Sequence, residues 1–386
     1  MHKITFTLKQ HTPLIHFQYD QPGATLRASE VKPKLDKFIL NDLGHGDYSA
    51  GVNKAKEQGW LIGKGEHPAL YYKMKIIDEN GSSDTREVEI MPSAIENSVY
   101  SGKIRLIITV DTGLKAEIEK CIPIFFAMTS FGKRQSKGFG CFFPDEMTAP
   151  KFEKLLLANK KIIYKLNQRL HQSVQRDSTF YKNVIFPKWN EIKSGINHFW
   201  KNPTVYKKSA VFNYLQDKSL RWDKRWIKKK VKQLIDDREL PIPLKQRHYA
   251  PIDINGKSSW QDSSNEEYRY GRALLGLAEL YEYATENKGM KYQVKVLNDQ
   301  IKRFKSPVTF KVIDGWVYLI VEKIEKEIFD KPFQFKVQKK RGNKKEGLPI
   351  LIHEKLYTPK ESEFSMVEFL DSCVHEIGFH KIELQK

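Results

Sequence analysis

Residues 103–143 read KIRLIITVDTGLKAEIEKCIPIFFAMTSFGKRQSKGFGCFF. Apolar and polar residues alternate from Lys103 to Val110, which predicts a half-buried strand. The apolar spacing of Leu114–Ser130 predicts a helix, and Pro123 should kink it. A glycine-rich loop follows, and Phe139–Phe143 predicts a short final strand. The stretch therefore predicts the order strand, helix, loop, strand.

The residues before it predict the matching half of the same unit. Lys3–Leu8 alternates as a strand does, Ser29–Leu40 shows a helical stripe, and Ala69–Ile77 is rich in Tyr and Ile, as strands are. Residues 41–67 are polar and glycine-rich and predict a long loop or an insertion, and Met91–Ser98 predicts a short helix. The order β-α-β-β-α-β is that of a ferredoxin-like, or RRM-like, domain, whose open sheet face is a common RNA platform.

A second, less regular copy is predicted in the C-terminal part. Its expected elements are a first strand near residues 239–250, a helix over Tyr268–Ala284, a hairpin turning at Asp314-Gly315, a strand over Lys331–Gln338, a helix over Glu363–Ile377 and a strand over Gly378–Leu384. Lys151–Arg176 predicts a further helix. We therefore expect an α+β protein of two ferredoxin-like βαββαβ domains with helical insertions: residues 1–148, a basic helical linker at 149–235, and residues 236–386.

Charge is the strongest feature of the composition. The 386 residues include 66 Lys and Arg against 47 Asp and Glu, a formal net charge of +19. Such a balance favours a polyanionic partner, above all a nucleic acid. No long apolar run predicts a membrane span and no signal peptide is visible, while three scattered cysteines suit neither a disulfide framework nor a zinc site. We expect a cytoplasmic protein without a cofactor or metal.

The glycine loop is the first candidate site. Gly132, Gly138 and Gly140 frame the cations Lys133, Arg134 and Lys137. The spacing does not fit a Walker A loop, and a loop between a helix and a strand does not fit the dinucleotide fingerprint. Successive N–H groups and cations can instead clamp RNA phosphates. The alternative is a solvated basic hairpin whose glycines serve the turn.

Two further clusters are candidates. Ser29 suits the N-cap of the first predicted helix, which would place Lys32 and Lys34 at its anion-binding N-terminus. The alternative there is a capped helix with exposed lysines. In RWDKRWIKKKVK, residues 221–232, two tryptophans could stack on bases, or could anchor the helix to the protein while its cations are solvated. The candidate phosphate ligands of this segment are Arg225, Lys228 and Lys229.

These segments carry a family resemblance. TPL at 12–14 with LRASEVKPKLDKFI at 26–39, FGKRQSKGFGCF at 131–142 and RFKSPVTFKV at 303–312 are similar to motifs of the RAMP superfamily of CRISPR-associated RNA-binding subunits. Within it, the chain most resembles the first subunit of the type III-B (Cmr) effector complex. Pro33 and Asp36 depart from the superfamily pattern.

The resemblance implies a non-catalytic subunit that contacts guide RNA, target RNA or both within a multi-subunit complex. It also implies RNA contacts by a set of residues drawn from all three motifs: Arg27, Ser29, Lys32, Lys34, Lys133, Arg134, Gln135, Lys137, Phe139, Arg303, Lys305 and Ser306.

Two other functions stay open at this point. His16 and His45 could act as general base and acid in a metal-independent endoribonuclease that processes CRISPR RNA. Asp20 lies where related backbone subunits place a cleaving aspartate, but one carboxylate is a poor metal site. A general RNA-binding scaffold outside CRISPR is the third hypothesis.

Overall fold

The computed structural model describes residues 1–16, 25–63, 68–79, 84–91, 94–171, 180–198, 205–245, 267–277, 280–301 and 303–383. These residues form two compact units that are not contiguous in sequence. Unit 1 comprises residues 1–186, 309–320 and 378–386, and unit 2 comprises residues 187–308 and 321–377.

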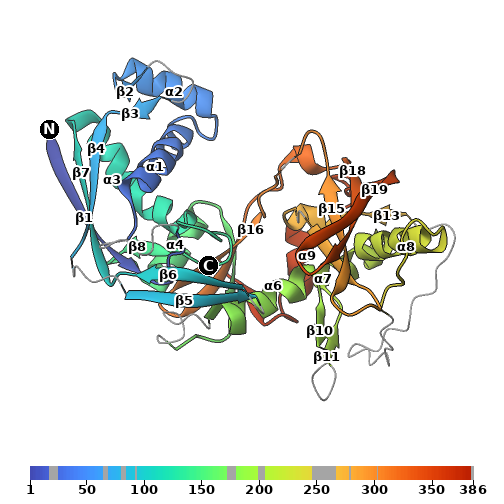
Figure 1. The fold of residues 1–386 in the computed structure, drawn as a ribbon. Coiled ribbons are helices and arrows are strands. Elements are labelled where there is room, and N and C mark those ends of the chain that lie inside the picture. The colour runs from blue at the N-terminus through green and yellow to red at the C-terminus, as the bar shows by residue number, and fades with distance from the viewer. Residues whose placement is uncertain are drawn as a thin grey trace. The chain divides into compact units, whose positions relative to one another are not determined.

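The first sheet of unit 1 has the strand order β4-β7-β1-β8, with every neighbouring pair antiparallel. Its strands are β1 (His2–Gln10), β4 (Tyr72–Asp78), β7 (Lys103–Val110) and β8 (Phe142–Pro144). Helices α1 (Ala28–Leu43) and α3 (Thr112–Met128) lie against this sheet (Figure 1). The strands predicted near residues 3–8, 69–77 and 103–110 and the two helices are thus confirmed.

Alternation explains which sheet face the helices cover. Ile4 and Leu8 of β1 and Ile104 and Leu106 of β7 belong to one buried core with Leu35 of α1 and the apolar residues of α3. The intervening residues Lys3, Thr5, Lys103 and Arg105 lie on the opposite face, because successive strand residues point to opposite sides. This second face is cationic, and the residues that β1 and β7 contribute to it include no aromatic side chain.

Several predictions for the N-terminal half are wrong. Residues 41–67 are not one loop, because α2 (Tyr48–Glu57) lies within them, capped by Asp47, whose carboxylate accepts from the amides of Ser49 and Ala50. Two short strands, β2 (Leu61–Ile62) and β3 (Ala69–Leu70), pair nearby. The predicted helix over Met91–Ser98 is a β-hairpin, β5 (Asp84–Met91) with β6 (Ala94–Tyr100).

A second sheet of unit 1 has the order β16-β17-β9-β20. Its strands are β9 (Ile162–Leu166), β16 (Val308–Ile313), β17 (Trp316–Val321) and β20 (Phe379–Lys381). The predicted hairpin at Asp314-Gly315 is confirmed, and both turn residues have positive φ, 50° and 81°. The helix predicted over Lys151–Arg176 is wrong beyond α4 (Ala149–Ala158), since the chain turns at Lys160 with φ of 54° and enters β9.

Unit 2 is built on an antiparallel sheet of order β14-β15-β18-β19. The strands are β14 (Leu280–Ala284), β15 (Met290–Leu297), β18 (Pro332–Arg341) and β19 (Lys344–Tyr357). The predicted helix over Tyr268–Ala284 is therefore wrong, and a short β13 (Tyr268–Arg269), a 3₁₀ turn (Gly271–Leu275) and β14 replace it. Gly276, at φ 100°, separates the turn from the strand.

The helices of unit 2 are α6 (Phe186–Lys193), α7 (Ala210–Asp217), α8 (Asp223–Asp236) and α9 (Met366–Cys373). The remaining elements are a π-helical turn at Tyr181–Ile185 in unit 1, the pairs β10 (Ile196–His198) with β11 (Val205–Lys207) and β12 (Arg221–Trp222) with β13, and a 3₁₀ turn at Lys326–Ile328. The helix expected over 363–377 is shorter than predicted. Of the first strand expected near 239–250, the described residues up to 245 form one antiparallel bridge, Leu244 with Thr285 beside β14, and no longer strand. Residues 246–250 lie outside the described part.

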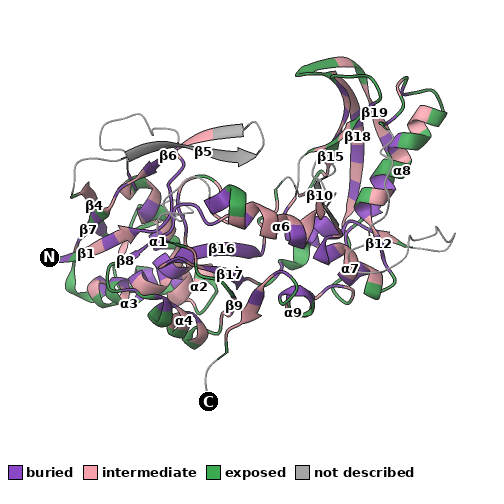
Figure 2. Cartoon of the chain, turned by 90° about the horizontal axis from the view of Figure 1, so that it is seen from below, coloured by how far each residue is buried: buried purple, intermediate pink, exposed green. Residues whose placement is uncertain are grey.

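The molecule thus combines antiparallel sheets with separate helices, which places it in the α+β class. Buried residues concentrate along β16, β17 and the inner sides of the other sheets (Figure 2). Within the described residues, the helices are all too short or too polar to cross a membrane.

Candidate nucleic-acid interface

The glycine loop of residues 131–141 is held rigidly from both sides. The amide of Lys133 donates to Ile15 O at 2.7 Å, and the amide of Gly140 donates to Pro13 O at 2.8 Å. On the other side, the amide of Phe310 donates to Ser136 O at 3.1 Å. The loop therefore joins the TPL segment to the second sheet of unit 1 through backbone hydrogen bonds.

Glycine is required at two positions of this loop. Gly132 has φ of 73°, and a Cβ there would lie 2.4 Å from Ile15 O. Gly140 has φ of 62°, and a Cβ there would lie 2.0 Å from Phe131 O. Both conformations are costly for other residues, and both approaches are too close for a side chain. The glycines therefore fix the path of the loop, as the sequence pattern predicts.

Three successive amides at the tip of the loop are available to a ligand. Within the described part of the chain, the N–H groups of Arg134, Gln135 and Ser136 donate no hydrogen bond, whereas those of Gly132, Lys133 and Lys137 do. Arg134 has positive φ, 54°. Consecutive N–H groups in such a turn can form an anion-binding concavity. These three N–H groups are therefore candidate donors to a phosphate or a carboxylate.

The loop cations face one carboxylate. Arg134 Nε and a terminal guanidinium nitrogen lie 3.3 and 3.2 Å from Glu96 Oε1, and Lys133 Nζ lies 3.7 Å from Glu96 Oε2. The Lys133 side chain is 61% exposed and that of Arg134 31%. Glu96, on β6, thus partly neutralises the pair. A phosphate that binds Arg134 must compete with Glu96, whereas Lys133 remains open to solvent.

Three predicted ligands in the loop serve its structure. Phe139 is fully buried and packs on Phe180 and Tyr181 with ring centroids 5.1 and 5.2 Å away, so it cannot stack on a base in this conformation. Gln135 Nε2 donates to Gly132 O within the loop at 2.7 Å. Lys137 Nζ is buried 5.8 Å from the centre of the Phe310 ring.

The cluster on α1 is more structural than the sequence predicts. Ser29 is not the N-cap, because the helix starts one residue earlier, with Arg27 at the cap and no side-chain cap bond. Lys34 Nζ binds Glu30 Oε1, and Lys32 Nζ binds Asp36 Oδ2, each at 2.8 Å. Both lysines also donate to backbone carbonyls, of Ser130 and Leu70. Asp36, one of the departures from the superfamily pattern, thus has a partner in Lys32.

Glu30 is a residue that sequence reasoning missed. Its Oε1 accepts from the amide of Gly132 at 2.8 Å as well as from Lys34. It therefore ties the first motif to the glycine loop. The S-E pair at the start of the helix was visible in the sequence, but nothing local indicated that the carboxylate reaches residue 132, which is 102 positions away.

Trp226 of helix α8 is buried, and Trp222, at the N-cap of this helix, is half-buried. Trp226 is 9% exposed and packs on Phe335, and Trp222 packs edge-on against Phe212. This favours the anchoring interpretation over base stacking. Lys228 and Lys229 are exposed, and Arg225 is half-buried. In the third motif, Arg303 and Lys305 are exposed, Lys305 pairs with Glu322 at 2.9 Å, and the Ser306 hydroxyl donates to Val308 O.

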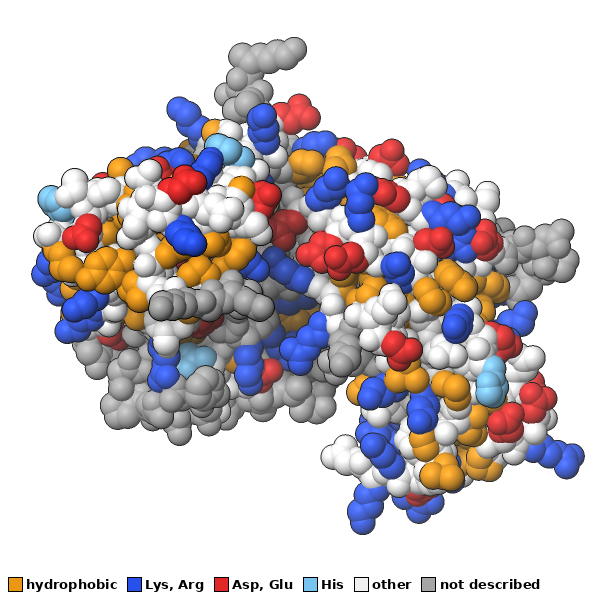
Figure 3. Space-filling view, turned by 90° about the horizontal axis from the view of Figure 1, so that it is seen from above, with side chains coloured by type: hydrophobic (Ala, Val, Ile, Leu, Met, Phe, Trp, Pro, Cys, Tyr) orange, Lys and Arg blue, Asp and Glu red, His pale blue; other side chains and the backbone are white. Residues whose placement is uncertain are grey.

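Figure 3 shows how the charged side chains spread over one face of the molecule, with acidic groups interspersed among the basic ones. The net charge of +19 is therefore not concentrated in one uniform patch on this face. Local geometry, and not overall charge, must identify an RNA site.

Buried charges lie elsewhere and are structural. Lys311 of β16 is fully buried and donates to Phe126 O at 3.0 Å and to Thr129 O at 2.5 Å, at the C-terminal end of α3. Burial lowers the pKa of Lys311 to about 8. In unit 2, Arg272 Nε donates to Asp223 Oδ2 at 2.6 Å, and both side chains are buried. Burial lowers the pKa of Lys193, which donates to Gly276 O, to about 7.

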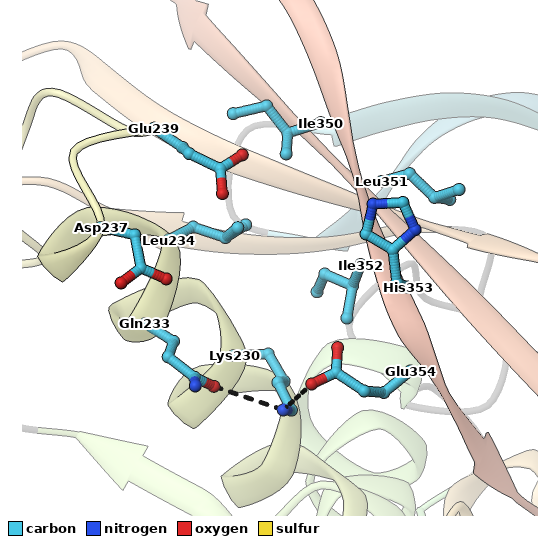
Figure 4. Close-up of a pocket in the computed structure, with 10 residues that line it drawn as sticks. All are labelled: Lys230, Gln233, Leu234, Asp237, Glu239, Ile350, Leu351, Ile352, His353 and Glu354. Atoms are coloured by element: carbon cyan, nitrogen blue, oxygen red, sulfur yellow. Dashed lines mark hydrogen bonds and ion pairs between the residues drawn. The ribbon is translucent and has the colours of Figure 1, made fainter.

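A groove of about 230 Å³ lies between α8 and β19 (Figure 4). Its walls carry Lys230, which pairs with Glu354 and lies 3.3 Å from Gln233, together with Asp237 and Glu239. Three carboxylates against one lysine repel phosphate. The groove is therefore not part of the candidate RNA site.

The residues considered for catalysis are not brought together. His16 lies near Arg27 and Glu30. Burial and the charge of Arg27 lower the pKa of His16, and the charge of Glu30 raises it. His45 follows the other end of α1, so a helix of 16 residues, roughly 24 Å, separates them. The proposed acid–base pair is therefore wrong, and Asp20 lies outside the described residues. Asp42, Glu117 and Cys121 cluster on α1 and α3, but Lys120 Nζ already lies 2.8 Å from Asp42.

Comparison with known families identifies the chain. The model of the Cmr1 N-terminal domain matches residues 1–202, and that of the Cmr1 C-terminal domain matches residues 206–385. The chain therefore belongs to the Cmr1 family, whose members are subunits of the type III-B CRISPR effector complex. The resemblance to the first subunit of that complex is confirmed.

Among solved structures, the chain is similar to the crystal structure of Cmr1 from Pyrococcus furiosus in its apo form. The two are 10% identical, the alignment covers 99% of this chain and 98% of that chain, and the TM-score is 0.39. A search of curated proteins found no match.

Proposed function

We propose that this chain is a non-catalytic RNA-binding subunit of a type III-B effector complex and contacts guide RNA, target RNA or both through backbone phosphates. The observation that carries the proposal is the tip of the glycine loop. Its three open amides stand beside Lys133 and Arg134 on a path fixed by Gly132 and Gly140. Amides and cations of this kind bind phosphate oxygens without reading the base.

The strand orders support two ferredoxin-like domains. Read across the first sheet, the strands lie in the order β8-β1-β7-β4, which is 4-1-3-2 when they are numbered along the chain. The second sheet, β20-β9-β17-β16, has the same order. We infer that the second domain begins at β9 and that most of unit 2 is inserted between its strands. Residues 149–235 then belong to this second domain and its insertion, rather than to a separate linker.

Other surface residues remain candidate RNA contacts, each within its own unit. Their side chains are exposed or half-buried, so we infer that they can reach a backbone phosphate. They are Lys228 and Lys229 on α8, Arg303 and Lys305 before β16, and Arg27 and Ser29 at the start of α1. Lys32, Lys34, Gln135, Lys137 and Phe139 contribute through the fold of the site, because their polar or aromatic groups already have partners in the protein or are buried.

The test is RNA binding by loop variants of the full chain. Lys133→Gln with Arg134→Gln should weaken binding of a labelled single-stranded RNA about tenfold and lower the salt slope by roughly 1.4, at about 0.7 per lost phosphate contact. Lys37→Gln with Lys56→Gln, exposed lysines of α1 and α2, makes the same change in charge and serves as control. Glu96→Gln should strengthen binding, because it releases Arg134.

The proposal fails if the loop pair binds RNA as tightly as the control pair does. It also fails if the loss depends on RNA sequence, since phosphate contacts weaken binding to all sequences alike. An endoribonuclease would instead cleave labelled repeat RNA in EDTA, and cleavage abolished by His16→Ala would revive that alternative.

A further inference from the structure

A second cationic surface lies on the sheet of unit 2. Every second side chain is buried over Met290–Val294 of β15 and over Phe333–Val337 of β18, as Figure 2 shows for β18. The residues between them form the open face of the sheet, because successive strand residues point to opposite sides. With the partners that face them on β19, the lysines of this open face are Lys291, Lys295, Lys336, Lys340 and Lys345.

These lysines lie directly opposite one another. Lys291 faces Lys340, Lys295 faces Lys336, and Lys340 faces Lys345 across the hairpin. Like charges in directly opposed positions destabilise a sheet. Glu282 on β14 forms an ion pair with Lys291, at 2.8 Å, and its charge also attracts Lys340. In the part of the chain that the structure describes, Lys295, Lys336, Lys340 and Lys345 form no ion pair.

Elsewhere in this chain, basic side chains on neighbouring strands form ion pairs with nearby carboxylates. On the other face of the β18–β19 hairpin, Lys339 and Arg341 pair with Glu346 at 3.2 and 3.1 Å. In unit 1, Lys103 faces Lys9, and Asp145 lies 3.1 Å from Lys103. The repulsion that remains on the open face of unit 2, above all at Lys295, Lys336 and Lys345, therefore indicates a site whose counter-charge comes from a ligand.

We propose that this open face binds the ribose-phosphate backbone of RNA as a second contact surface, separate from the glycine loop. The inference rests on the proposed RNA-binding function, but on different residues in a different unit. Lysine offers a compact charge without a preferred plane, which suits phosphates held in variable positions. The two lysine rows, Lys295 with Lys336 and Lys291 with Lys340 and Lys345, are four residues, about 13 Å, apart along the strands.

The face should bind without sequence preference. Its outward residues on β14, β15 and β18 include no aromatic side chain to stack on a base, and the exposed Tyr357 of β19 lies opposite Pro332, eight residues along β18 from Lys340. A phosphate chain that crosses the lysine rows would neutralise the opposed pairs. RNA should therefore both bind here and stabilise the hairpin.

The experiment compares three full-length variants with the wild type in binding a labelled oligouridylate of about 30 nucleotides. The sheet variant is Lys336→Gln, Lys340→Gln and Lys345→Gln. Its control is Lys323→Gln, Lys326→Gln and Lys360→Gln, exposed lysines of unit 2 that make the same change in charge. The loop pair Lys133→Gln and Arg134→Gln is the third. Lys340→Gln alone, which removes two opposed pairs, replaces the triple change if that variant does not fold.

We expect the sheet variant to lose about tenfold in affinity relative to its control, with a salt slope smaller by roughly 2. Its thermal midpoint at low salt should rise, because repulsion is removed. Affinity and slope equal to those of the control would overturn the inference, whatever the midpoint does. The inference would also be overturned if the sheet variant no longer associated with an acidic protein subunit but bound RNA as tightly as its control.

The two proposals fail differently. If only the loop pair matches its own control, the loop site is wrong and the sheet surface stands. If only the sheet variant matches its control, the reverse holds. A wild-type chain that does not bind the oligouridylate at any salt concentration contradicts both.

Discussion

Gly140 shows how a single residue sets the geometry of the site. Its amide donates to Pro13 O, and its α-carbon passes so close to Phe131 O that a methyl group has no room. The positive φ is a second, independent reason for glycine. The path of the loop therefore depends on this close crossing of two chain segments.

Gly140→Ala should therefore lower the free energy of unfolding by about 3 kcal/mol or more, with about 1–2 from the backbone conformation and the rest from the clash. Gly59→Ala is the matched control, because Gly59 has φ of 68° but a Cβ on it would meet no atom within 4 Å. It should cost about 1 kcal/mol. Equal losses in urea unfolding would show that the close approach at residue 140 carries no energy.

The sequence predicts the glycine loop but not the residues that bind it. The three glycines and the cations are adjacent in sequence, so their pattern is visible. Glu96 and Glu30, which hold Arg134 and the amide of Gly132, come from a hairpin and a helix far away in the chain. Long-range partners of this kind leave no local signal. The burial of Phe139 was equally invisible, since an aromatic residue beside a glycine loop suits both stacking and packing.

At the scale of elements, Lys311 links a strand to a helix end. Its ammonium group donates to two carbonyls at the C-terminus of α3, where positive charge is favoured, yet it lies in a fully buried position. Burial lowers its pKa from the usual 10.5 to about 8. Between these values the unfolded chain binds the proton more tightly than the native state does.

Stability should consequently rise with pH from about 8 to about 10.5, by roughly 3 kcal/mol at most from this group. Below pH 8 the lysine is protonated in both states, so the contribution no longer changes. Lys311→Met should remove this part of the slope. Since Lys193 and several buried tyrosines also titrate, the quantity to measure is the difference between wild type and variant in urea unfolding at each pH. A constant difference across this range would contradict the account.

The strands of the second sheet explain why the C-terminal half is harder to predict. β9 follows α4 after only a tight turn at Lys160, so its Ile162, Ile163 and Tyr164 continue an apolar pattern that fits a single long helix equally well. Its partner strands lie beyond residue 307, and no local pattern connects them. The Tyr268–Ala284 error has a similar origin, because a sequence rich in Leu, Ala and Glu favours a helix until tertiary pairing with β15 overrides it.

At the scale of the whole molecule, the chain divides its sheets between two compact units. The glycine loop and the two sheets that it joins lie in unit 1, whereas the lysine rows lie in unit 2. Membership of the Cmr1 family places the chain in a multi-subunit CRISPR complex. The net positive charge of the chain suits an RNA partner. However, Arg134, Lys32 and Lys34 form ion pairs within the protein, so part of this charge is already balanced by its own carboxylates.

Hydrogen–deuterium exchange of the amides of Arg134, Gln135 and Ser136, with and without bound single-stranded RNA, tests the central claim most directly. If the loop tip binds phosphate, exchange in a peptide covering residues 131–138 should slow when RNA binds, and Lys133→Gln with Arg134→Gln should weaken that protection. Unchanged exchange at these three amides, in a sample shown by the same titration to be saturated with RNA, would contradict it.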